Sequence, residues 1–118
     1  MAALPRVRIG AESRPETHTR LVLVDAGLPE PVPNPPIMLP SGSVRHPDLA
    51  YLEWRVAFEY QGDRHRQDRA RWQRDVRRRR EFEGCGWHVI EVTADDLGPA
   101  RGEFLATVRE ILQARRRA

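Results

Sequence analysis

The sequence predicts an α/β fold in which helices flank a central mixed sheet. A helix-forming stretch beginning near residue 13 precedes two runs with strand character, SVRHPDLAYL and RVAFEYQ. A second, proline-free helical stretch is followed by the apolar strand WHVIEVT and an amphipathic C-terminal helix. The expected order is therefore α-β-β-β-α-β-α, which is typical of layered α/β proteins.

The chain length predicts one domain. With 118 residues and 40% hydrophobic content, the chain can bury one core but not two. We expect residues 1–12 to form an aperiodic lead-in, consistent with the remnant of a longer ancestral chain, and residues 13–118 to form the domain. The single cysteine, Cys85, and the lack of a long apolar run or signal-peptide core predict a cytoplasmic protein without membrane contact.

The first helix is expected at a capping-box pattern. Ser13 and Glu16 have the spacing of such a box, Pro15 lies in the first turn, and Gly27 ends the helix. The proline-rich stretch 28–40 is expected to be a loop that leads into an edge strand at residues 37–39, and Ser41-Gly42 then reverses the chain.

The next two strands are expected to form a tight hairpin around Glu53-Trp54. The predicted partners are Tyr51 with Val56, Ala50 with Ala57, and Asp48 with Glu59. Facing carboxylates repel each other unless a cation lies between them, so this register favours a divalent metal ion. Magnesium or manganese there could polarise a phosphoryl oxygen. A slip of one residue would move one carboxylate to the opposite face.

Residues 66–82 predict a second long helix, closed by Gly84 and Gly86. Trp72, Val76 and Phe82 are expected on its buried side, and Asp75 is expected to pair with Arg71 or Arg79. The arginines predicted to contact phosphates beside the metal are Arg66, Arg69, Arg77 and Arg80. The apolar residues predicted to bury one face of the last helix are Phe104, Leu105, Val108, Ile111 and Leu112.

Three short patterns follow one another in the chain: Pro47-Asp48, Glu59-x-Gln61 in the next strand, and Gly62-x-x-His65. Together they resemble the motif of the PD-(D/E)XK nuclease superfamily. The chain also contains the segments GLPEP, RHPDLAY, RVAFEYQGDRH, RWQRDVRRRREFEGCGW and HVIEVTADDL. These segments more closely resemble one family of that superfamily, the uncharacterised family related to very-short-patch-repair endonucleases. The likeness extends from about Ser13 to Leu97. It implies a restriction-endonuclease-like fold with an α-β-β-β-α-β core, and a metal-dependent DNA endonuclease.

The resemblance also implies roles for single residues. Asp48 and Glu59 become ligands of magnesium or manganese, with His65 as a polar group that could act as an acid or base. The backbone carbonyl of Tyr60 could add a ligand, and Glu16 corresponds to an acidic residue often found on the first helix. Gln61 occupies the position of the motif's lysine, and its neutral amide cannot supply the positive charge of that lysine.

Two other function classes remain open. In one, the missing lysine marks a catalytically decayed module of the same fold that binds nucleic acid or regulates. In the other, the domain is purely structural, and removing one of the facing carboxylates should stabilise it. All 20 basic residues are arginines, which suits a phosphate partner, although genomic base composition produces the same bias. A homodimer is one arrangement that would let such a nuclease cut both strands.

Overall fold

The computed structural model describes residues 14–61 and 69–117. Two stretches with predicted features lie outside the described residues. They are residues 1–13, which hold the lead-in and Ser13, and residues 62–68, which include His65, Arg66 and Asp68. The elements in chain order are α1 (Pro15–Asp25), β1 (Val32–Pro33), β2 (Ile37–Met38), β3 (Val44–Arg45), β4 (Leu49–Tyr51), β5 (Val56–Tyr60), α2 (Arg69–Gly84), β6 (His88–Val92), the short 3₁₀ helix η2 (Asp95–Leu97) and α3 (Arg101–Arg117).

The main sheet is mixed, as the sequence predicted. Its strand order is β1-β4-β5-β6, with antiparallel pairing from β1 to β5 and parallel pairing between β5 and β6. The parallel connection passes through α2, as a crossover between parallel strands requires. Strands β2 and β3 form a separate antiparallel pair.

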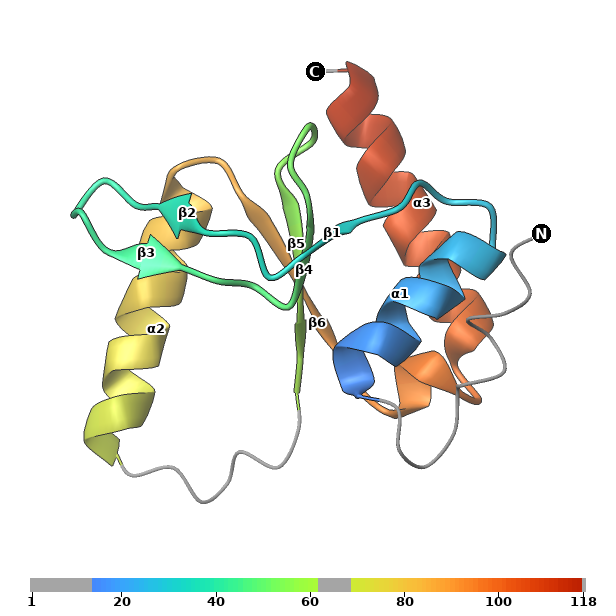
Figure 1. Ribbon diagram of the computed structural model, residues 1–118, viewed down its shortest axis with the longest axis horizontal. Helices are drawn as coiled ribbons and strands as arrows, with labels where there is room; N and C mark the ends of the chain where they lie inside the picture. Colours follow the sequence, from blue (N-terminus) through green and yellow to red (C-terminus); the bar gives the residue numbers. More distant parts are fainter. Residues whose placement is uncertain (1–13, 62–68, 118) are drawn as a thin grey trace.

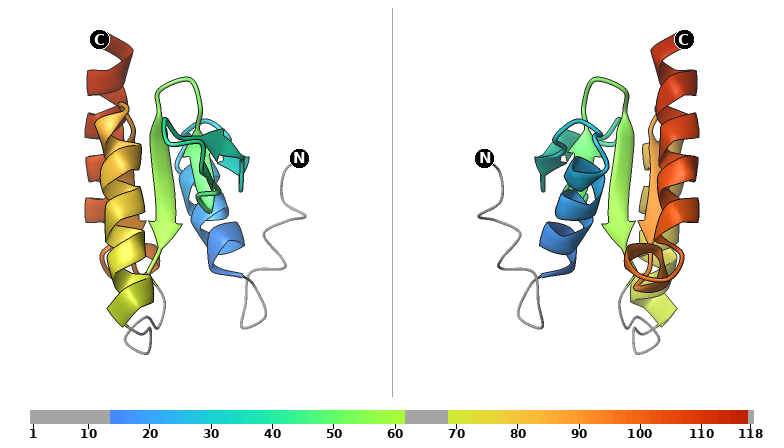
Figure 2. Two further views of the ribbon diagram at one scale, coloured as in Figure 1. Left: turned by 90° about the vertical axis from the view of Figure 1, so that its left-hand side faces the viewer. Right: turned by 90° about the vertical axis from the view of Figure 1, so that its right-hand side faces the viewer.

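Elements cover both faces of the main sheet. Figure 1 shows the sheet nearly edge-on, with α1 and α3 on one side and α2 with the β2–β3 pair on the other. Figure 2 views the molecule from each of these two sides, so that the layers overlap and β5 appears as a broad arrow. Side chains on neighbouring positions of β5 therefore point into different layers. Of the described helices, none is long and apolar enough to cross a membrane.

The two faces carry separate cores. The core under α1 and α3 is the larger one, and its buried members include Leu23, Tyr51, Phe58, Phe104 and Val108. The core on the other face is small and consists of Leu39, Ala50, Ala57, Phe82 and Trp87. The apolar stripe predicted for the last helix is confirmed, because Phe104, Val108 and Leu112 are buried and Leu105 and Ile111 pack beside them.

The predicted register of the hairpin is confirmed, but its loop is not. Tyr51 pairs with Val56 and Ala50 with Ala57, as expected. The connection is a four-residue turn, 52–55, in place of the two-residue loop, and Arg55 adopts a left-handed φ of 57° in it. The two-residue loop and the four-residue turn both leave Tyr51 paired with Val56, so the pairing of the two strands is unchanged.

The first run of the hairpin is two strands, which the sequence did not predict. It breaks at His46-Pro47 into β3 and β4, which belong to different sheets. Proline has no N–H to donate to a ladder, so it separates paired segments. The predicted edge strand at 37–39 is also corrected: residues 37–38 pair with β3, and β1 forms the edge of the main sheet.

The helix ends differ slightly from the expectation. Arg14 is the N-cap of α1 and its side chain makes no capping hydrogen bond, while Glu16 lies 3.6 Å from Arg14 in an ion pair. The capping box is therefore not the start of this helix. Helix α2 ends as predicted, with Gly86 at a φ of 102° just beyond it. Strand β6 is buried only in part: Ile90 and Val92 are buried, whereas His88 and Glu91 are exposed.

Candidate functional site

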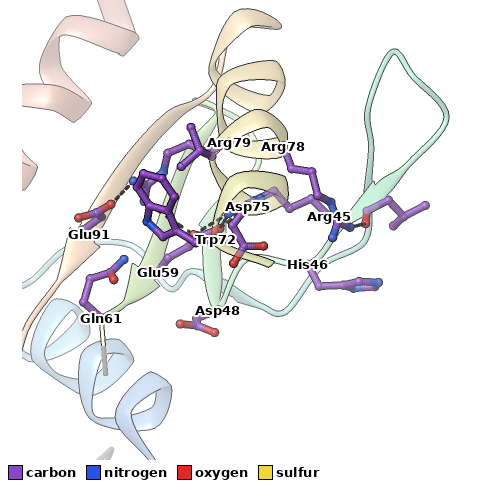
Figure 3. A pocket seen from close by; sticks show the side chains of 12 residues that line it. Arg45, His46, Asp48, Glu59, Gln61, Trp72, Asp75, Arg78, Arg79 and Glu91 are labelled. Carbon is purple, nitrogen blue, oxygen red and sulfur yellow. Dashed lines mark hydrogen bonds and ion pairs between the residues drawn. The ribbon is translucent and has the colours of Figure 1, made fainter. Parts of the chain in front are cut away.

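A pocket of about 750 Å³ lies between α2 and the main sheet, on the face with the small core. Figure 3 shows its polar lining, which comes from β3, β5, β6 and α2. The lining residues are Val44, Arg45, His46, Asp48, Glu59, Gln61, Trp72, Asp75, Val76, Arg78, Arg79 and Glu91. Charged groups of both signs dominate this set.

Strand geometry explains why the acids meet here. Residues 57, 59 and 61 share one face of β5, and Ala57 on that face belongs to the small core beside the pocket. Glu59 is in register with Glu91 of the parallel neighbour β6, so both carboxylates lie on the pocket side. Asp48, the residue just before β4, lines the same pocket. The structure thus places Asp48, Glu59 and Gln61 at one pocket.

Arginines already neutralise Glu59. The residue is 8% exposed, and its carboxylate accepts two hydrogen bonds from Arg45, at 2.9 Å from Nε and 2.8 Å from Nη2. Arg79 on α2 lies 3.9 Å from the same carboxylate and also forms an ion pair with Glu91. Such a bidentate pair is the strongest form of a carboxylate–arginine contact. The four side chains form one network with no net charge.

Asp48 is held by the backbone of β5. Its Oδ2 accepts a hydrogen bond of 2.7 Å from the N–H of Tyr60. In an extended strand the N–H and C=O of one residue point to the same side, so the Tyr60 carbonyl is directed toward Asp48 as well. The premise that two uncompensated carboxylates face each other is therefore wrong, since Arg45 and a backbone N–H satisfy them.

The described donors fit a divalent cation only in part. Within residues 14–61 and 69–117, no group of three or more His, Cys, Asp or Glu side chains is placed to hold a metal ion. Asp48 and Glu59 are oxygen donors of the kind magnesium takes. The Arg45 guanidinium, however, fills the cation position beside Glu59. A metal ion at Glu59 would therefore have to displace the guanidinium of Arg45.

Among the described residues, the arginines that line the pocket are not the ones the sequence predicted. Arg69, Arg77 and Arg80 are exposed and are absent from the lining of the pocket, while Arg45, Arg78 and Arg79 line it. Helical spacing in the sequence could have indicated Arg79, because positions 72, 75, 76 and 79 share one face of α2. Arg79 lies on that face and forms an ion pair with Glu91. It therefore does not serve as the partner of Asp75, which was one of the two predicted pairings.

Three further expectations have an outcome here. Trp72 is 58% exposed and lines the pocket, so its assignment to the buried side of α2 is wrong. Phe82 is fully buried, as predicted, and Val76 is half-buried. Glu16 is not among the residues that line the pocket. Gln61 lines it, and its backbone N–H donates to the Val92 carbonyl at 2.7 Å.

Comparison with known proteins finds two relatives, both uncharacterized proteins of Mycobacterium tuberculosis, from two strains. Each is 32% identical to this chain over 108 residues. The match covers 92% of this chain but only 40% of the length of the relatives. No protein-family model matches the chain, and no solved structure matches it significantly.

Proposed function

We propose that the pocket is the active site of a metal-dependent DNA endonuclease with a restriction-endonuclease-like fold. The observation that supports this most directly is the register of β4 and β5, which brings Asp48 and Glu59 to one pocket from adjacent strands. The resemblance of the same residues to the PD-(D/E)XK motif gives these two acids a shared chemical role. Three arginines line the same pocket, and the planar guanidinium group of arginine suits phosphate oxygens.

The chain's own residues divide the work. Asp48, Glu59 and the Tyr60 carbonyl would hold magnesium or manganese, which supplies Lewis-acid polarisation of a phosphoryl oxygen and a more acidic water. Arg45 leaves Glu59 and takes a phosphate oxygen, since a guanidinium binds carboxylates and phosphates with the same bidentate geometry. In this role Arg45 supplies the positive charge that Gln61 lacks.

The second candidate is a nucleic-acid-binding module without hydrolytic activity. The observation that favours it is the Arg45–Glu59–Arg79–Glu91 network, which neutralises the acids without a metal. Breaking a bidentate pair with a buried carboxylate is costly, so a cation has to compete with Arg45 for Glu59. The two candidates differ in whether the metal wins that competition.

Nicking of supercoiled plasmid with magnesium or manganese separates them. We expect the wild type to nick DNA and Asp48→Asn and Glu59→Gln to lose the activity by at least about a hundredfold, as EDTA does. Glu110→Gln, an exposed acid on α3 away from the pocket, is the control and should nick normally. DNA binding without nicking under either metal would establish the binding module.

Thermal unfolding gives a second readout that does not depend on activity. A ligand that binds only the folded state stabilises it by about 1 kcal/mol at roughly five times its dissociation constant. We expect manganese to raise the melting temperature of Arg45→Ala more than that of the wild type, because Glu59 is then free of its guanidinium. An equal rise in both proteins would show that Arg45 does not compete with the metal.

A further inference from the structure

Trp72 differs from the other two tryptophans of the chain. Trp87 is buried and stacks on Phe82, with ring centroids 5.1 Å apart, and Trp54 packs on Tyr51 under the guanidinium of Arg116. Trp72 belongs to neither core, and in the described part of the chain its indole stacks on no other ring. With 58% of its surface exposed, it is the one aromatic residue among the exposed large apolar side chains of the described residues.

Polar and charged side chains line the pocket beside Trp72. Its indole lies at the pocket with the half-buried Asp75 and Val76 of the same helix, and with Gln61 at the end of β5 (Figure 3). An aromatic plane beside a carboxylate and an amide offers a stacking surface and hydrogen-bonding groups for the edge of a base. The exposed Arg78, whose guanidinium lies 3.5 Å from the Val44 carbonyl, adds positive charge at the same pocket.

We propose that Trp72 is a stacking platform for an unpaired nucleobase, so that the pocket takes single-stranded or locally unpaired DNA. Bases inside a duplex are stacked on their neighbours and cannot lie on a side chain, whereas an unpaired base can. An aromatic face next to arginines is the combination by which proteins hold single strands with little sequence preference. This inference deepens the proposed function, because it names the form of DNA that reaches the same pocket.

Binding measured in EDTA tests the inference apart from cleavage. The probes are a labelled single-stranded thymidine oligonucleotide of about 12 nucleotides, an abasic oligonucleotide of the same length, and the corresponding duplex, read by fluorescence anisotropy. The abasic strand keeps every phosphate but has no base to stack. We expect the wild type to bind the thymidine strand about tenfold more tightly than the abasic strand.

Trp72 variants then locate the difference. Trp72→Ala should weaken binding of the thymidine strand about tenfold and leave the abasic strand unchanged, while Trp72→Phe should keep most of the affinity. Leu52→Ala, which removes an exposed apolar side chain from the hairpin turn, is the matched control and should bind both strands normally. Far-UV circular dichroism of each variant verifies that it is folded.

Two results would overturn the inference. Equal losses on both strands in Trp72→Ala would mean that the residue supports the fold or the charges and not a base. No binding of either strand by the folded wild type would mean that the exposed indole does not stack on a base of a single strand. The outcomes are separable from the proposed function: a protein that nicks plasmid regardless of Trp72 remains a nuclease, and one that stacks bases without nicking remains a base-binding module.

Discussion

The two faces of the main sheet are built from different kinds of side chain. Under α1 and α3 the sheet meets a continuous apolar core, in which Phe58 contacts Tyr51 and Phe104 edge to face, with ring centroids 5.7 and 6.5 Å apart. Under α2 the small core reaches only the C-terminal end of the helix, at Phe82. Toward the helix N-terminus its place is taken by the pocket and its ion pairs.

This difference teaches how one sheet serves stability and binding together. Alternating residues of β5 serve opposite layers, so Phe58 stabilises the fold while Glu59 beside it lines the pocket. Buried apolar area stabilises a fold by about 25 cal/mol per Å². Ion pairs contribute far less once desolvation is included. We therefore expect the face under α1 and α3 to dominate the free energy of unfolding.

Truncating one aromatic residue on each face gives the largest expected contrast. Phe58→Ala should lower the free energy of unfolding by about 3–5 kcal/mol, because it opens a cavity in the larger core. Trp72→Ala removes a larger ring from the other face, yet should change stability by less than about 0.5 kcal/mol, since that ring is mostly exposed. Urea denaturation followed by circular dichroism measures both. A similar loss in the two variants would place Trp72 in the core.

The pair formed by Arg45 and Glu59 gives an intermediate effect. Arg45→Met should cost about 2–3 kcal/mol, less than a fully buried pair, because Arg79 still partly neutralises the buried carboxylate. Adding Glu59→Gln should recover most of the loss, since the buried charge is then gone. A double-mutant cycle in urea denaturation measures the coupling between the two side chains.

The ion pair of Arg20 with Glu30 is the matched control for that cycle. These side chains are 2.6 Å apart but considerably more exposed than Arg45 and Glu59. Arg20→Met should therefore cost less than about 1 kcal/mol. If Arg45→Met cost no more than this control, Glu59 would not depend on Arg45, and a metal ion would meet little competition from it.

The sequence was sufficient for the pairing of β4 with β5 and insufficient for the division of the strands between two sheets and for the charges of the site. The register of β4 and β5 follows from side-chain alternation, and its turn could change from two residues to four without altering it. The partners of Glu59 could not be predicted, because Arg45 and Arg79 reach it from β3 and α2, whose approach is set by tertiary packing. Trp72 was misassigned for a related reason: apolar helical positions usually face a core, but the core under α2 ends near Phe82.

Substitution of arginines on α2 and α3 should have the smallest effect on the free energy of unfolding. On α2 it should have the clearest effect on DNA binding. On α3, Arg115 donates to the Gly86 carbonyl at 2.8 Å, and the Arg116 guanidinium lies 4.7 Å from the centre of the Trp54 ring. On α2, Arg77 and Arg80 are exposed, and neither forms an ion pair with another described residue. Arg115 and Arg116 of α3 thus contact the rest of the fold, whereas Arg77 and Arg80 of α2 are available to a polyanion.

Two double variants separate these roles. Arg115→Ala with Arg116→Ala should cost about 1 kcal/mol of stability and leave DNA binding unchanged. Arg77→Ala with Arg80→Ala should change stability by less than about 0.5 kcal/mol. If both arginines contact phosphates, the slope of log affinity against log salt concentration falls by about 2. An equal fall in slope for both variants would mean that DNA responds to the overall charge of the protein and not to α2.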